Sequence, residues 1–229
     1  TTKSHYNYIY NHFIRDSFGR RRVSDIRYTD VKKYYYSIII EQKMKACTLE
    51  NVHTLLHPSF QMAVRDGVIR NNPTDGIMGE IKKSRVWDKG KRRSLTIPEQ
   101  KAFMTFLYES RDFMGWRSVV TILLGTGMRI GECLGLRWED LDFNKRTISI
   151  NHSMVYRNID GEGSKRHIST PKTLAGTRTI PMLQEVYDAF LEEYQLQSIT
   201  GFCRAVVDGY SGFVFANAAG QLTIPEDVN

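Results

Sequence analysis

A lysine- and arginine-rich segment, KKSRVWDKGKRR at residues 82–93, constrains the fold of this chain more than any other feature. It has a single acidic residue and almost no apolar periodicity, which is typical of a link between domains rather than of a packed helix. We therefore predict a helical domain over residues 1–84, a basic linker over 85–95 and a second domain over 96–229. The segment is either a solvated linker or a strap that lies along phosphates.

Positive charge is concentrated in the first part of the chain. Residues 1–95 contain 19 Lys and Arg against 9 Asp and Glu, a balance of +10, whereas residues 96–229 contain 13 against 16, a balance of −3. A polyanion is the natural partner of such a field, because each neutralised phosphate releases condensed counterions. The distribution therefore favours a nucleic acid as the partner.

Composition excludes several other classes of protein. No apolar run approaches the roughly 20 residues that cross a bilayer, and the first residues lack the apolar core of a signal peptide. Three widely spaced cysteines suggest neither a disulfide framework nor a zinc site, and they favour reduced thiols in the cytoplasm. We expect no membrane contact, no metal and no cofactor.

The first domain should consist of helices. After Thr29, the run DVKKYYYSIIIEQKMK collects its apolar residues on one helical face, and a second helical run extends from Thr48 to Gly67. Pro58 interrupts that second run and predicts a kink or break there. The run RNNPTDGIMG, residues 70–79, is predicted to be a loop.

The second domain should be mainly helical with a small antiparallel β-sheet. Thr96 and Glu99 form a capping box before an amphipathic helix, and WRSVVTILLG predicts a more buried helix that GTG ends. RTISINHSMVYR and GTRTIPM are two β-type runs separated by a polar stretch, and GFVFAN indicates a short buried strand. QEVYDAFLEEYQLQ returns to the helical period.

An arginine directly after a glycine turn is the first candidate for chemistry. Gly127 can adopt the positive φ of a sharp turn, which places Arg129 in the first turn of a new helix, where backbone N–H groups favour an anion. Glu132 shares its face and can orient the guanidinium. Such a fork can bind two oxygens of one phosphate. The alternative is an exposed Arg–Glu surface pair.

The wider run TGMRIGECLGLRWEDLD, residues 126–142, resembles the first box of the tyrosine recombinases, the phage-integrase family. The family pattern is T-G-x-R-x-x-E-x-x-x-L-x-W-x-D-I/L-D. The positions that fit are Thr126, Gly127, Arg129, Glu132, Leu136, Trp138, Asp140, Leu141 and Asp142. In that family the arginine clamps the scissile phosphate and the glutamate supports it, so the resemblance implies these catalytic roles for Arg129 and Glu132.

A second resemblance concerns a lysine. ISTPKTLAGTRTIPM is similar to the β-hairpin whose turn carries the catalytic lysine of the family, in the form found in integrases of conjugative transposons. This implies that Lys172 is the general acid that protonates the departing 5′ oxygen. Without the family it would be a solvated charge, and Lys165 is a weaker competitor. Residues 156–167 lengthen the hairpin, add positive charge and should reach toward DNA.

The family pairs its catalytic domain with a helical core-binding domain, and together they clamp the duplex. We expect phosphate contacts from the first domain, from the linker and from the hairpin region. The side chains expected to bind DNA are Arg20, Arg21, Arg22, Lys32, Lys33, Arg92, Arg93, Arg157, Lys165, Arg166, Thr173 and Arg178.

Two parts of the family pattern are missing. The H-x-x-R box should follow GFVFAN and the nucleophilic tyrosine should come later, whereas the last tyrosine, Tyr210, precedes that run. The run HFIR at residues 12–15 fits the box by chance, since it lies in the wrong domain. We therefore expect the front part of an enzyme: core-binding domain plus part of the catalytic domain, without the C-terminal part and without an N-terminal arm-binding domain.

The resemblance implies a bacterial, cytoplasmic site-specific recombinase that integrates and excises a mobile element. Its tyrosine would form a 3′-phosphotyrosine intermediate on double-stranded DNA without metal or ATP, in dimers and tetramers, with an excisionase-type accessory protein as a possible partner. The alternatives are a DNA-binding protein without chemistry, a type IB topoisomerase-like enzyme and a structural helical adaptor.

Overall fold

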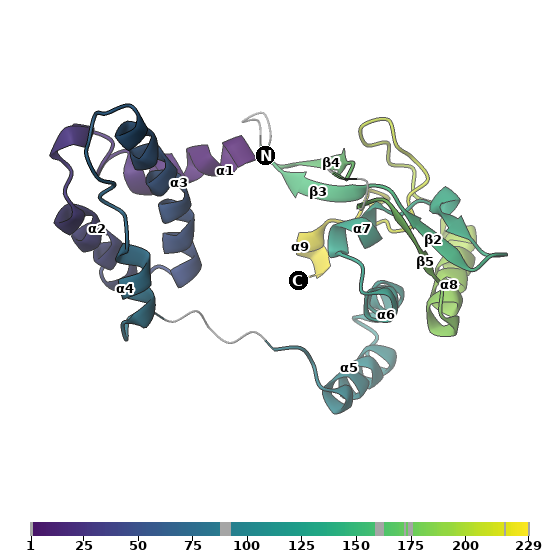
Figure 1. The fold of residues 1–229 in the computed structure, drawn as a ribbon. Coiled ribbons are helices and arrows are strands. Elements are labelled where there is room, and N and C mark those ends of the chain that lie inside the picture. Colours follow the sequence, from purple (N-terminus) through teal and green to yellow (C-terminus); the bar gives the residue numbers. More distant parts are fainter. Residues whose placement is uncertain are drawn as a thin grey trace. The chain divides into compact units, whose positions relative to one another are not determined.

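The structure is a computed structural model, and it divides into two compact units, residues 1–94 and 95–229 (Figure 1). The residues that it describes are 2–87, 93–158, 163–171, 173, 176–217 and 219–228. Both units are dominated by helices, and the strands form two small antiparallel sheets in the second unit. Among the described residues, no helix is long and apolar enough to cross a membrane.

The first unit is helical, as predicted. Its elements are α1 (Thr2–Ile9), which continues into a π-helical turn η1 (Tyr10–Ile14), a short 3-10 turn η2 (Val23–Asp25), α2 (Tyr28–Ile40), α3 (Ala46–Arg65) and α4 (Ile77–Lys83). The core of the unit includes Tyr35 and Ile38 of α2 and Leu49 and Val52 of α3, all fully buried. The apolar helix faces that the sequence predicts are therefore the faces buried in the core.

Two predictions for this unit were wrong in detail. Of the kink or break predicted at Pro58, the break does not occur: α3 runs through Pro58, because Leu56 and Phe60 on either side are both buried and hold the segment against the core. The predicted loop over residues 70–79 ends early: Gly76 adopts φ +77°, and α4 begins directly after it.

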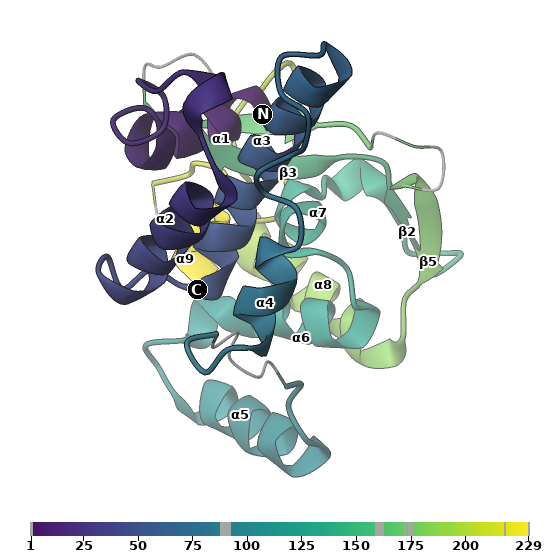
Figure 2. The ribbon, with the colours of Figure 1, turned by 60° about the vertical axis from the view of Figure 1, so that its left-hand side comes forward.

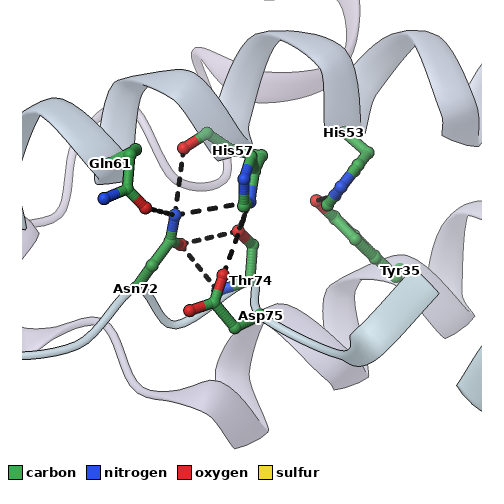
Figure 3. A network of polar contacts seen from close by, with 7 residues as sticks. All are labelled: Tyr35, His53, His57, Gln61, Asn72, Thr74 and Asp75. Carbon is green, nitrogen blue, oxygen red and sulfur yellow. Dashed lines mark hydrogen bonds and ion pairs between the residues drawn. The ribbon is translucent and has the colours of Figure 1, made fainter. Parts of the chain in front are cut away.

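A buried polar network fixes the connection between α3 and α4 (Figure 3). The Asn72 amide nitrogen donates to the His57 carbonyl oxygen (3.1 Å) and to Gln61 Oε1 (3.3 Å). Its oxygen accepts from the backbone N–H (3.0 Å) and the hydroxyl (2.6 Å) of Thr74. Since Asn72 and Thr74 are both buried, these bonds satisfy polar groups that water cannot reach.

The second unit begins with the predicted capping box, in which the Thr96 N–H donates to Glu99 at 2.9 Å. The helices are α5 (Ile97–Glu109), α6 (Arg117–Thr126), α7 (Ile130–Gly135), α8 (Gln184–Thr200) and α9 (Pro225–Val228), with 3-10 turns η3 (Met114–Trp116) and η4 (Trp138–Asp140). The core of the unit includes Ile122, Leu134, Ile148, Phe190 and Phe213.

The strands fall into two sheets rather than one. β1 (Leu141–Asp142), β2 (Thr147–Ile150) and β5 (Arg178–Pro181) form a three-stranded sheet in the order β1-β2-β5, and β3 (Ser153–Arg157) pairs with β4 (Lys165–Ser169). The run RTISINHSMVYR is therefore two strands in different sheets, and β4 begins in the polar stretch and overlaps the start of the hairpin expected around Lys172. GFVFAN is buried at Phe213, Val214 and Phe215 but forms only isolated bridges, so the strand prediction was wrong.

Candidate active site

A glycine turn sets the position of Arg129. The helix α6 ends at Thr126, and Gly127 follows it with φ +64°, a conformation that costs other residues a steric penalty. Arg129 has extended backbone angles, φ −70° and ψ 148°, and precedes α7 as its N-cap. The prediction that it lies in the first helical turn is corrected by one position, because the chain needs an extended residue to redirect it after Gly127.

The carboxylate of Glu132 is the centre of the site. It is buried, with 7% of the residue exposed, and each of its oxygens accepts two hydrogen bonds. The Arg129 backbone N–H donates to Oε2 (3.0 Å), and the Arg129 guanidinium donates to Oε1 (2.8 Å). Arg129 therefore holds the glutamate with both backbone and side chain, while 80% of its own side chain stays exposed.

The second partner of Glu132 is Arg178, which comes from β5. Its Nη1 donates to Oε1 (3.2 Å) and its Nη2 to Oε2 (2.7 Å), a two-pronged contact that fits a carboxylate. The Arg178 side chain is 33% exposed, far less than that of Arg129. We predicted Arg178 as a DNA contact and missed this pair, because nothing in the sequence connects residues that lie 46 positions apart.

These bonds control the charge of Glu132. Burial raises the pKa of its carboxyl, but the hydrogen bonds from Arg178 and Arg129 outweigh burial and lower the pKa to about 2. The carboxylate is therefore ionised at neutral pH. Two guanidinium groups around one carboxylate leave a net charge of +1 at this point, which suits a site for an anion.

Close packing fixes the helix that carries Glu132. The helix α7 lies against β3 (Figure 2), and a Cβ atom added to Gly131 would come within 2.5 Å of the Met154 carbonyl oxygen. A Cβ atom on Gly135 would lie 2.9 Å from the Met154 nitrogen. Only glycine permits this approach, so the backbone of the β3–β4 hairpin supports the helix directly.

A buried polar cluster lies at the other end of α7, and sequence reasoning missed it as a unit. The ring nitrogen Nε2 of His152 lies 2.6 Å from the Gly135 carbonyl oxygen, and His152 itself is 4% exposed. Asn151 donates to the buried Asp140 at 3.1 Å. In the sequence, Asp140 stood out only as one of the positions that fit the family pattern. This cluster fixes the end of the helix rather than offering groups to solvent.

The hairpin expected around Lys172 differs from the prediction. The strands on either side of the segment, β4 and β5, do not pair with each other, since β4 pairs with β3 and β5 with β2. The strands β3 and β4 include residues that we expected to lengthen the Lys172 hairpin, and they form a separate hairpin instead. The chain between β4 and β5 connects the two sheets. Lys172 lies outside the described residues. Thr173 is exposed, and its carbonyl oxygen accepts from the Gly176 N–H at 2.9 Å.

The other candidate DNA contacts of the second unit and the linker lie in varied surroundings. Arg157 and Lys165 are exposed and face each other across the β3–β4 hairpin. Arg166 is partly buried, and its Nε donates to the Leu222 carbonyl oxygen at 2.6 Å, so part of its guanidinium is committed within the unit. Arg93 takes part in an interaction within the chain, and Arg92 lies outside the described residues.

The basic residues of the first unit are exposed or ion-paired at its surface. The observed pairs are Arg20 with Asp16 (3.0 Å), Arg21 with Asp30 (3.2 Å) and Lys32 with Glu80 (2.5 Å). Arg22 and Lys33 are exposed. Since surface pairs of this kind are weak, they can open to contact a phosphate. Among the described residues, no group of three or more His, Cys, Asp or Glu side chains could bind a metal ion.

Comparison with known proteins decides the family. The sequence profile described as "Phage integrase family" matches residues 93–229, more than half of the chain, including the turn with Arg129 and Glu132. The chain belongs to this family. The resemblance inferred from the first box is therefore confirmed, as is the mainly helical recombinase fold.

Relatives and solved structures agree with this assignment. The transposase of transposon Tn916 from Enterococcus faecalis is 29% identical over 228 residues, covering 100% of this chain and 54% of the relative. The ICEBs1 integrase of Bacillus subtilis is 27% identical over 177 residues, covering 76% of this chain and 44% of the relative. The chain thus spans about half the length of the curated relatives that it matches.

The Tn1549 transposon integrase, solved in complex with transposon right end DNA, superimposes with a TM-score of 0.86 at 30% identity, covering 99% of this chain and 68% of that one. A lambda integrase dimer bound to a core site matches at 15% identity with a TM-score of 0.62, which is a likeness of fold alone.

Proposed function

We propose that this chain forms part of a site-specific recombinase that integrates and excises a mobile element by cutting and rejoining double-stranded DNA. The observation that carries the proposal is the arrangement at Arg129: its guanidinium is fixed by a buried, ionised Glu132 but remains 80% exposed. A preoriented cation at the surface is what a phosphodiester in DNA requires. The kinship with integrases of conjugative transposons supports the same reading.

The chemistry would be an in-line displacement at phosphorus. The tyrosine hydroxyl of the complete protein loses its proton to solvent as its oxygen attacks the phosphate. The bond to the 5′ oxygen breaks, and Lys172 donates the proton that this oxygen takes up. Arg129 stabilises the extra negative charge on the phosphate oxygens in the transition state. The 3′-phosphotyrosine keeps the bond energy, so the reverse attack by a 5′-hydroxyl reseals the strand without ATP.

The remaining parts of the proposal concern DNA and partners. Residues 1–84 act as the core-binding half of a clamp, residues 85–95 link it, and residues 96–229 supply part of the catalytic domain. The basic residues of the first unit and the exposed Arg157 and Lys165 of the β3–β4 hairpin bind phosphates. Strand exchange between two sites requires dimers and tetramers on DNA, with an excisionase-type protein as an accessory. The reaction takes place in the bacterial cytoplasm.

The test is a suicide-substrate assay on a protein that extends past Asn229 and includes the tyrosine. Arg129→Ala should slow formation of the covalent protein–DNA band by about 10²- to 10³-fold, while DNA affinity changes only a few-fold. Lys172→Ala should slow it as well. Arg204→Ala, which removes an exposed arginine elsewhere in the second unit, is the matched control and should react normally.

The outcomes separate the alternatives. A band that forms at the wild-type rate in both variants would refute the assignment of the site. DNA binding without any covalent band in the wild-type protein would favour a binding protein. Relaxation of supercoils without exchange between two separate sites would favour a type IB topoisomerase, and affinity that is insensitive to salt would favour a structural adaptor.

A further inference from the structure

Two arginines share one carboxylate in this site, and they are committed to it to different degrees. Arg178 directs two nitrogens at Glu132, one to each oxygen, whereas Arg129 directs one side-chain nitrogen at Oε1. The Arg178 side chain is also the less exposed of the two, at 33% against 80%. The geometry therefore assigns the two guanidinium groups different tasks.

We propose that Arg178 is a positioning residue, which acts through Glu132 and keeps the guanidinium of Arg129 available for a phosphate. This inference rests on the proposed function, since it assumes that Arg129 contacts the scissile phosphate. It replaces the expectation that Arg178 itself contacts DNA.

Charge balance supplies the physical reason. Without Arg178, Glu132 would be bound by Arg129 alone. One negative and one positive charge would then cancel, and the pair would be neutral. With Arg178 occupying both oxygens, Glu132 remains an anchor for Arg129 but its charge is already compensated. The group as a whole keeps a charge of +1, which belongs to the more exposed arginine.

Chain topology adds a second task. Arg178 is the first residue of β5, which is held to β2 by the register Ile150↔Arg178. The ion pair thus joins the turn that carries Arg129 to the start of β5. Two elements that lie far apart in sequence share one anchor at Glu132.

Separate measurements of DNA affinity and of the cleavage rate distinguish a positioning role of Arg178 from a direct contact with DNA. In the complete protein, Arg178→Ala should slow DNA cleavage at saturating DNA by about 10- to 100-fold, because Arg129 is misplaced. DNA affinity should fall only a few-fold, because one phosphate contact among many is weakened, and the larger loss of rate at saturating DNA is what marks a positioning role. Arg178→Lys should recover part of the rate, since it restores the charge but not the fork.

Coupling to Glu132 is the decisive control. In a Glu132→Gln background, Arg178→Ala should cost little further rate, because the anchor is already lost. In this chain by itself, carboxyl NMR should show the pKa of Glu132 moving up from about 2 toward its ordinary value in Arg178→Ala, provided that thermal melting shows a folded variant.

Two results would overturn the inference: weaker DNA binding with a normal cleavage rate at saturating DNA, or full additivity of Arg178→Ala and Glu132→Gln. If Arg129→Ala itself cleaves normally, the proposed function has failed instead. If Arg129→Ala is inactive but Arg178→Ala cleaves normally, only the role of Arg178 is wrong.

Discussion

Replacing Glu132 by glutamine should destabilise the second unit by about 3 kcal/mol at neutral pH. The bonds from Arg178 and Arg129 lower the pKa of this carboxyl from its ordinary value of 4.5 to about 2. Each unit of pKa shift corresponds to about 1.4 kcal/mol of stabilisation of the ionised form in the folded protein. Glutamine lacks that charge and cannot accept four hydrogen bonds through one oxygen.

The effect should depend on pH in a defined direction. Because the folded-state pKa lies below the unfolded-state value, the stabilisation is complete above about pH 4.5 and is lost as pH falls toward about 2. Near pH 2 about half of the folded molecules carry a protonated Glu132, which resembles glutamine. The difference in unfolding free energy between wild type and Glu132→Gln should therefore shrink from about 3 kcal/mol to a small remainder.

Urea unfolding followed by tryptophan fluorescence can measure this difference. Trp116 and Trp138 lie in the second unit and Trp87 in the first, so a Trp87→Phe background makes the signal specific for the unit that holds Glu132. Glu139→Gln is the matched control. Its carboxylate pairs with Arg137 but is 69% exposed, and its loss should cost less than about 1 kcal/mol. A Glu132→Gln effect that is equally large at pH 7 and pH 2.5 would refute the electrostatic account.

Two further predictions concern stability. Gly131→Ala should destabilise the second unit by about 1–3 kcal/mol in urea unfolding, because its Cβ would meet the Met154 carbonyl oxygen, whereas Gly79→Ala in α4 has open space and should be neutral or stabilising in the first unit. Equal effects of the two substitutions would contradict the close packing of α7. Thr96→Ala should cost about 1 kcal/mol and increase hydrogen exchange in the first turn of α5, and unchanged exchange there would exclude a capping role.

Local signals in the sequence were sufficient for several elements of the fold. Thr96 and Glu99 form the predicted capping box, Gly127 ends α6 in the predicted left-handed conformation, and the apolar period of residues 30–40 marks the buried face of α2. Each of these features depends on residues within one or two turns of each other. Physical rules of short range therefore apply to them without knowledge of the tertiary fold.

Features that depend on distant partners were predicted poorly. The alternation in residues 147–157 indicates extended chain but does not tell that β2 pairs with β5 while β3 pairs with β4. Pro58 normally disrupts a helix, and yet buried neighbours hold α3 together across it. In both cases the energy that decides comes from packing against segments that are remote in sequence.

The site shows the same division. The sequence by itself determined that an arginine follows a glycine turn and that a glutamate lies three residues later, because both facts concern one short stretch of chain. Only the tertiary structure decided that Glu132 is buried, that Arg178 arrives from β5 to share it and that Gly131 lets α7 touch the backbone of β3. A carboxylate takes its charge state and its orientation from whatever surrounds it in space, and those surroundings are assembled only when the chain folds.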